Sequence, residues 1–139
     1  MGSLLDGRRI RVSKQTTLQG SLLGTGFPYR DQSDWLEVYL DIFTDFTKIV
    51  GAIRRPGSAA LDLAYVAAGR YDGFWEFGLK PWDVAAGVLL IQEAGGLVEN
   101  LIPGQDPVDS GSLLCGTPKI FDAMKKVVTK YNNRLEKLY

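Results

Sequence analysis

The 139-residue sequence contains no histidine and only one cysteine. Without histidine, the chain cannot form a Ser-His-Asp or Cys-His catalytic arrangement or a zinc site with imidazole ligands. Cys115 cannot form an internal disulfide, and its position after two leucines is typical of a buried strand, where cysteine packs as a small hydrophobic residue. The chemistry of this chain must therefore rest on carboxylates, which favour hard cations such as Mg²⁺.

Charge and hydropathy exclude further classes of protein. The 16 Lys and Arg residues balance the 16 Asp and Glu residues, so no overall field attracts the chain to nucleic acid or to an anionic membrane. No run of about 18 apolar residues is present to cross a bilayer, and no basic segment followed by an apolar core marks a secretory signal. We therefore expect one cytoplasmic globular domain with no membrane partner and no nucleic-acid partner.

Strand signals and helix signals alternate along the chain. Apolar residues recur at helical spacing over 34–49, Ser58 can cap a helix, and Pro81 suits the first position of another. The patterns predict strands over 21–25, 52–55, 71–77, 97–99 and 112–115, and helices over 34–49, 58–69, 81–96 and from 117 onward. This βαβ-like alternation predicts an α/β fold, in which helices pack on a mixed β-sheet.

Four motifs between residues 57 and 96 carry the most specific signal. They are Gly57-Ser58-Ala59-Ala60, Glu76, the segment from Trp82-Asp83 to Gly87, and Glu93-Ala94-Gly95-Gly96. In order and spacing they resemble the carboxyl-terminal half of the inositol monophosphatase family, whose signature W-D-x-A-A-G follows G-[ST]-A-A and precedes E-A-G-G. The resemblance implies the carboxyl-terminal subdomain of the sugar-phosphatase fold.

The same resemblance implies that part of the protein is missing. Family members carry a glutamate and a D-P-x-D-G-T motif upstream of these four motifs, and this chain begins after that region. Met1-Gly2-Ser3 is typical of a start added by cloning. We therefore expect residues 4–139 to form a carboxyl-terminal α/β domain whose amino-terminal half, with the catalytic residues, is absent.

The resemblance also assigns roles to individual residues. It implies that Asp83 coordinates catalytic Mg²⁺, that Glu76 accepts hydrogen bonds from substrate hydroxyls, and that Gly57, Ser58 and Ala59 line the same sugar-alcohol pocket. Each assignment has a structural alternative. Asp83 would also stabilise a helix as a first-turn acid, Glu76 could be a solvated carboxylate where a strand meets a loop, and the glycine-serine-alanine segment could simply start a helix.

These roles imply a magnesium-dependent phosphatase acting on inositol monophosphate or a similar polyol phosphate monoester. Glu76 would repel a second phosphate, which favours a polyol ester, while fructose-1,6-bisphosphatase and nucleotide phosphatase activities remain alternatives for the parent protein. A different class is a noncatalytic interaction or dimerisation module, which the missing ligands favour. We expect the parent to be a homodimer and the isolated chain to be inactive.

Two features are misleading when taken alone. The segment Asp106-Pro107-Val108-Asp109-Ser110-Gly111 looks like the family's metal motif, but it follows W-D-x-A-A-G and ends in Ser-Gly instead of Gly-Thr. Turn formation by aspartate, proline and glycine explains it. The basic residues Lys125, Lys126, Lys130, Arg134 and Lys137 alternate with apolar residues at helical spacing, a pattern typical of a solvated helix face.

Overall fold

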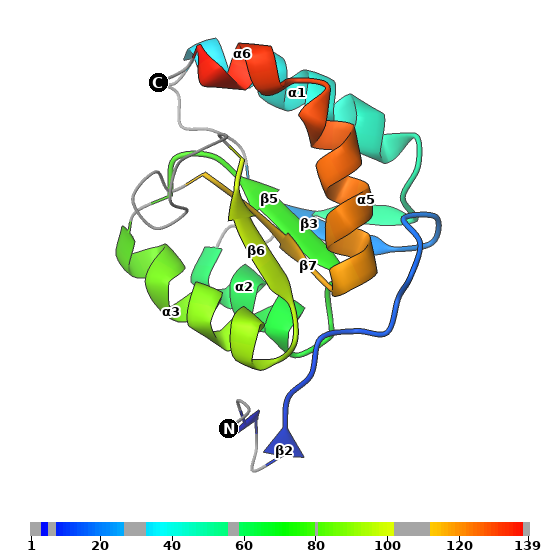
Figure 1. Cartoon of the computed structure of the whole chain (residues 1–139), viewed down its shortest axis with the longest axis vertical. Coiled ribbons are helices and arrows are strands. Elements are labelled where there is room, and N and C mark those ends of the chain that lie inside the picture. The colour runs from blue at the N-terminus through cyan, green and yellow to red at the C-terminus, as the bar shows by residue number, and fades with distance from the viewer. Residues whose placement is uncertain are drawn as a thin grey trace.

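The centre of the protein is a five-stranded mixed sheet with the strand order β4-β3-β5-β7-β6 (Figure 1). The structure is a computed structural model, and it describes residues 4–5, 8–26, 33–55, 59–79, 81–101 and 112–137. β3 pairs in parallel with β4 and β5, whereas β7 runs antiparallel to β5 and β6. The strands are β3 (Leu22–Thr25), β4 (Ala52–Arg54), β5 (Gly73–Glu76), β6 (Leu97–Asn100) and β7 (Leu113–Gly116).

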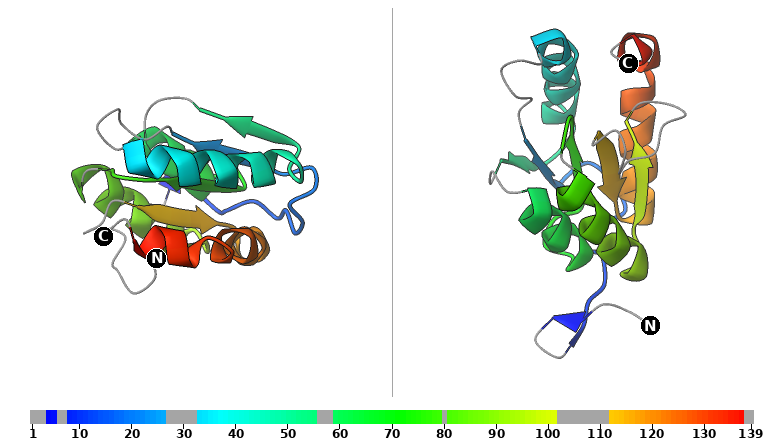
Figure 2. Two further views of the ribbon diagram at one scale, coloured as in Figure 1. Left: turned by 90° about the horizontal axis from the view of Figure 1, so that it is seen from above. Right: turned by 90° about the vertical axis from the view of Figure 1, so that its left-hand side faces the viewer.

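Helices cover both faces of this sheet, so the described elements form three layers (Figures 1 and 2). One face carries α2 (Ala59–Ala67) and α3 (Pro81–Glu93), and the other carries α1 (Ser33–Thr47), α5 (Pro118–Thr129) and α6 (Asn132–Glu136). A short hairpin of β1 (Leu4–Leu5) and β2 (Arg8–Arg9) lies apart from the sheet. The predicted α/β fold with a mixed sheet is confirmed.

Alternation along the strands divides the interior into two hydrophobic cores. Trp75 belongs to the core beneath α1 and α5, whereas Phe74 and Cys115 belong to the core beneath α2 and α3. The Trp75 ring lies 4.7 Å from the ring of Phe46 on α1. Cys115 is fully buried, and burial raises the pKa of its thiol, so the interpretation as a core cysteine is confirmed.

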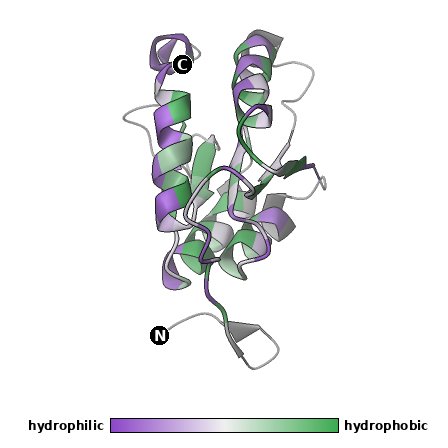
Figure 3. Cartoon of the chain, turned by 90° about the vertical axis from the view of Figure 1, so that its right-hand side faces the viewer, coloured by the Kyte–Doolittle hydropathy of each residue, from purple (hydrophilic) through white to green (hydrophobic). Residues whose placement is uncertain are grey.

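The carboxyl-terminal helix is amphipathic, and Figure 3 shows hydrophobic and hydrophilic residues on opposite sides of α5. Three basic residues here form ion pairs, Lys125 with Glu99, Lys130 with Asp45, and Arg134 with Asp41. Tyr131 donates a hydrogen bond to Asp45, and the helix predicted from residue 117 is divided there into α5 and α6.

None of the helices in the described ranges has the length and hydropathy needed to span a membrane. Segment 106–111 lies outside the described residues.

Helices α2 and α3 approach closely at Gly87, which is buried against Leu63. A Cβ atom placed on Gly87 would lie 2.7 Å from the Cβ atom of Leu63, a separation that real side chains do not adopt. The small size of Gly87 therefore sets the distance between the helices. Ala85 and Ala86 are exposed and contribute no such close approach among the described residues.

Gly87→Ala is expected to lower the free energy of unfolding by up to about 2 kcal/mol, because an overpacking cost of about 1 to 3 kcal/mol outweighs the gain of roughly 1 kcal/mol from replacing a helical glycine. Urea denaturation of the purified chain measures the difference. Ala86→Ser, at the neighbouring exposed position, is the control and should change stability by no more than about 0.5 kcal/mol. Increased stability of Gly87→Ala would show that the two helices can separate without cost.

Candidate active site

The parallel strands bring several predicted site residues to one edge of the sheet. β3, β4 and β5 run in the same direction, so the residues at their carboxyl ends, Gly26, Arg55 and Glu76, share that edge. The helices that follow β4 and β5 also begin there. In open α/β sheets ligands bind beyond the carboxyl ends of the parallel strands, so this edge is the candidate active site.

The structure places three of the predicted residues at this edge. Glu76 is the last residue of β5, Ala59 is the first residue of α2, and Asp83 lies in the first turn of α3. The other two members of the predicted pocket, Gly57 and Ser58, lie outside the described residues. Both helices direct their amino-terminal ends, with their unpaired amide groups, toward the edge where Glu76 ends its strand.

Glu76 is not the solvated carboxylate that its position between strand and loop suggested as the alternative. It is only 9% exposed. Its carboxyl group lies over the backbone of Gly26, where a Cβ atom on that glycine would be 2.5 Å from the carboxyl carbon. The side chain is therefore folded against β3 within the edge of the sheet.

The side chains of Thr25 and Tyr39 form a hydrogen-bonded pair on the α1 side of the sheet, and this pair stabilises the same edge. The hydroxyl of Thr25 donates to the carbonyl oxygen of Trp75 at 2.9 Å, so the hydroxyl of Tyr39, 3.0 Å away, donates to Thr25. Burial, and secondarily the charge of Glu76, raises the pKa of Tyr39 to about 12, while Thr25 and Arg55 act in the opposite direction. Tyr39 is therefore a neutral donor at physiological pH.

Neither Tyr39 nor Thr25 was a predicted site residue. Tyr39 lies among the apolar residues of a helix and reads as part of its buried face, and Thr25 is an ordinary residue at a strand end. Their connection to Glu76 depends on which strands pair in the sheet, and local sequence patterns do not indicate this pairing. Trp82, in the most specific motif, is 74% exposed and does not pack on the described core.

Asp62, in the first turn of α2, is a second buried carboxylate that sequence patterns missed. It is 1% exposed, and its Oδ1 atom has no hydrogen-bond partner within the described part of the chain. Burial raises the pKa of this carboxyl group to about 6. Its charge also contributes to the raised pKa of Tyr71, so the two groups lie within electrostatic range.

The available donor atoms suit a hard cation, because the chain has no histidine and its one thiol is buried with a raised pKa. Yet the described residues contain no group of three or more acidic or sulfur side chains that could hold a metal ion. They therefore do not form a complete metal site by themselves. Further ligands would have to come from outside the described residues.

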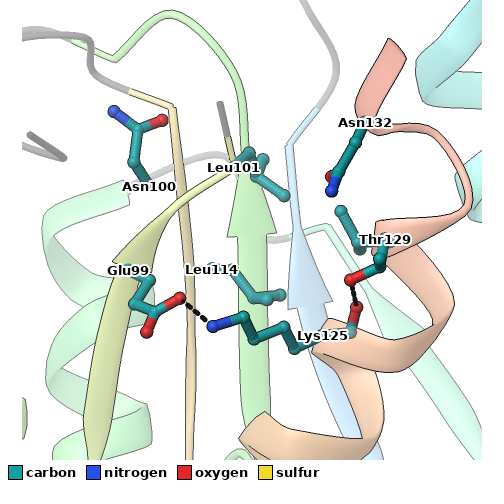
Figure 4. A pocket seen from close by; sticks show the side chains of 8 residues that line it. Glu99, Asn100, Leu101, Leu114, Lys125, Thr129 and Asn132 are labelled. Carbon is teal, nitrogen blue, oxygen red and sulfur yellow. Dashed lines mark hydrogen bonds and ion pairs between the residues drawn. The ribbon is translucent and has the colours of Figure 1, made fainter. Parts of the chain in front are cut away.

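Two of the hollows formed by the described residues lie near the sheet, and neither of these two is lined by a predicted site residue. One of about 260 Å³ lies between the end of the sheet and α5, where Glu99 and Lys125 form an ion pair of 2.7 Å (Figure 4). Leu101, Leu114 and Val128 line this hollow, and all three belong to the core beneath α1 and α5. The other, about 430 Å³ and open, is lined by Ile53, Arg54, Arg55 and Tyr71.

Comparison with known proteins identifies the family. A sequence model of the inositol monophosphatase family matches residues 1–133. The chain is 54% identical over 124 residues to the Nus factor SuhB of Pseudomonas aeruginosa, covering 88% of this chain and 46% of that protein. It is 45% identical over 129 residues to the inositol-1-monophosphatase of Mesorhizobium japonicum, covering 93% and 48%. The solved inositol monophosphatase of Anabaena matches with a TM-score of 0.84 at 40% identity, covering 94% of this chain and 53% of that one.

The chain belongs to the inositol monophosphatase family, a family of phosphatases that generally depend on a metal. The resemblance carried by the four motifs is therefore confirmed. The chain spans about half the length of the curated relatives that it matches.

Asp62→Asn is expected to stabilise the isolated chain at pH 8 by about 3 kcal/mol and to have little effect near pH 4. The folded-state pKa is about 6, above the ordinary aspartate value of 3.8, so the penalty for the buried charge grows as the pH rises through this interval and is complete above it. Denaturant unfolding at several pH values measures the difference. Asp122→Asn, at an exposed position of α5, is the control. Equal effects of Asp62→Asn at pH 4 and pH 8 would contradict a buried, uncompensated charge.

Proposed function

We propose that this chain supplies the polyol-binding part and one metal ligand of a magnesium-dependent phosphatase that hydrolyses inositol monophosphate or a similar polyol phosphate monoester. The observation that carries the proposal is the nearly buried carboxylate of Glu76 at the sheet edge where α2 and α3 begin. The relative from Mesorhizobium japonicum, named inositol-1-monophosphatase, supports this choice of substrate.

The elements at this edge suit the two halves of such a substrate. The amino-terminal ends of helices favour anions, so the starts of α2 and α3 provide a favourable environment for the phosphate group. A carboxylate offers several lone pairs to hydroxyl donors, so Glu76 would bind the polyol, beside the segment formed by Gly57, Ser58 and Ala59. Its negative charge would disfavour a substrate with a second phosphate group.

Asp83 would supply one oxygen ligand to Mg²⁺ from the first turn of α3. A bound metal ion of this kind neutralises phosphoryl oxygens and lowers the pKa of a coordinated water. The other ligands and the catalytic residues would come from the parent protein outside this chain, with residues 4–139 as its carboxyl-terminal domain. Within this chain, the buried side of the site would orient the substrate hydroxyls and exclude water from them.

We further propose that the parent acts as a homodimer in the cytoplasm. Large apolar side chains are exposed on two helices, Leu36 and Leu40 on α1, and Trp82 and Leu89 on α3. Contiguous exposed apolar surface is typical of regions that another protein surface covers. The remaining half of the parent and a second copy would together cover these two helices.

A second candidate function is that of a Nus factor, the role named for the Pseudomonas aeruginosa relative that is 54% identical to this chain. This role corresponds to the class of noncatalytic interaction modules. The two functions can be separated, because an interaction surface does not require the carboxylate of Asp83. A parent that lacks phosphatase activity but complements loss of the Nus factor would favour this candidate.

In the full-length parent, Asp83→Asn is expected to lower magnesium-dependent phosphate release from inositol 1-phosphate by at least about 100-fold. Losing a residue that hydrogen-bonds to a metal ligand already lowers activity by about 10- to 100-fold, and losing the ligand itself should cost no less. Asp122→Asn, which changes the same charge on the exposed side of α5, is the control and should retain activity. Retained activity of Asp83→Asn at subsaturating magnesium would contradict the assigned role.

A further inference from the structure

Gly24 within β3 and Gly26 directly after it lie beside large side chains of β5. In the parallel register Gly24 is the partner of Phe74 and Thr25 is the partner of Trp75, so Gly26 is the next residue along and lies beside Glu76. A Cβ atom on Gly24 would be 3.0 Å from the ring of Phe74. A Cβ atom on Gly26 would overlap the carboxyl group of Glu76 itself. The bare backbone of β3 is thus the surface on which these two side chains lie.

The need for glycine at position 26 is one of space and not of backbone conformation. The glycines with positive φ in the described residues are Gly20, Gly69, Gly78 and Gly95, and Gly26 is not among them. An alanine could therefore adopt the backbone conformation of residue 26 without strain. The methyl group of that alanine, however, would overlap the carboxylate of Glu76.

The strands cannot separate easily to make room for an added methyl group. Thr25 bonds to the carbonyl oxygen of Trp75 and to Tyr39, which holds β3 and β5 together one residue before Gly26 and Glu76. The Trp75 side chain is fully buried among the rings of Tyr39, Phe43 and Phe46. The mobile part of the overlap is the end of the Glu76 side chain, which has rotatable bonds that the backbone lacks. An added methyl group would therefore move the carboxylate and leave the sheet in place.

We propose that Gly26 determines substrate specificity by holding the carboxylate of Glu76 at the position where it accepts hydrogen bonds from the polyol. This inference rests on the proposed function and adds a residue to it. Gly26 acts through Glu76 and is a positioning residue, because its own contribution is the absence of a side chain. The position of the acceptor then decides between phosphate esters that carry neighbouring hydroxyls and esters that do not.

The experiment compares two substrates of the full-length parent, inositol 1-phosphate and p-nitrophenyl phosphate, which has no free hydroxyl. Gly26→Ala is expected to lower kcat/KM for inositol 1-phosphate by roughly tenfold or more, the effect of losing a hydrogen bond to a charged group, and to change that for p-nitrophenyl phosphate by less than about threefold. Glu76→Ala should shift the preference by the same amount. Adding Gly26→Ala to Glu76→Ala should have no further effect, because the carboxylate that the methyl group displaces is gone.

Ala52→Ser is the matched control, since it adds one heavy atom at an exposed position on β4, the other strand beside β3. It should leave the preference between the substrates unchanged. An unchanged preference in Gly26→Ala, together with a lost preference in Glu76→Ala, would overturn the role of Gly26 and leave the proposed function intact. A parent that hydrolyses neither substrate would overturn both.

A thermal-unfolding cycle on the isolated chain tests the geometry without any activity. Gly26→Ala should lower Tm when Glu76 is present and should have a clearly smaller effect, or none, when residue 76 is alanine. Equal decreases in both backgrounds would overturn the packing of Glu76 on Gly26, whatever the activity of the parent. Non-additive decreases with an inactive parent would place the failure in the proposed function and not in the geometry.

Discussion

The parallel register of β3 with β5 is the constraint on which the candidate site depends. At the beginning of β5 the carboxylate of Asp72 accepts hydrogen bonds from the backbone N–H of Leu22 at 2.7 Å and from the hydroxyl of Ser13 at 2.5 Å. At the other end Thr25 bonds to the carbonyl oxygen of Trp75. With both ends held, a slip of one residue would reverse which face each side chain occupies, so it is strongly disfavoured.

This register has chemical consequences because it decides what lies beside Glu76. In the observed pairing that neighbour is Gly26, which has no side chain that would displace the carboxylate. The same pairing directs Trp75 into the opposite core, where its ring contacts α1. One side of β5 therefore supplies an anchored hydrophobic core, and its final residue supplies a carboxylate at the edge. The site and the core are consequences of the same strand pairing.

Two features of the described residues are energetically unfavourable. Asp62 is buried without a hydrogen-bond partner for its Oδ1 atom in the described ranges, and α3 exposes Trp82 and Leu89 to solvent. A buried carboxylate and exposed large apolar side chains both carry a free-energy cost. The relatives, of which this chain covers about half, have further residues that could offset these costs.

Sequence patterns predicted the elements and their class, because the periodicity of apolar residues and the turn residues are local signals. They also marked Cys115 as a core residue, and through their motifs they predicted Glu76 and Asp83 as site residues. They did not reveal Gly26, Thr25 or Tyr39, whose importance arises from the pairing of strands far apart in the sequence. The burial of Asp62 was missed for a related reason, since a first-turn acid in a helix is normally solvated.

The most direct test of the account measures magnesium-dependent phosphate release from inositol 1-phosphate by this chain, alone and mixed with a separately expressed amino-terminal half of the same parent. We expect activity only in the mixture, because the described residues lack a complete set of metal ligands. Activity of the chain alone would contradict the claim that the site is shared. A folded complex without activity would contradict the assignment of the sheet edge as a phosphatase site.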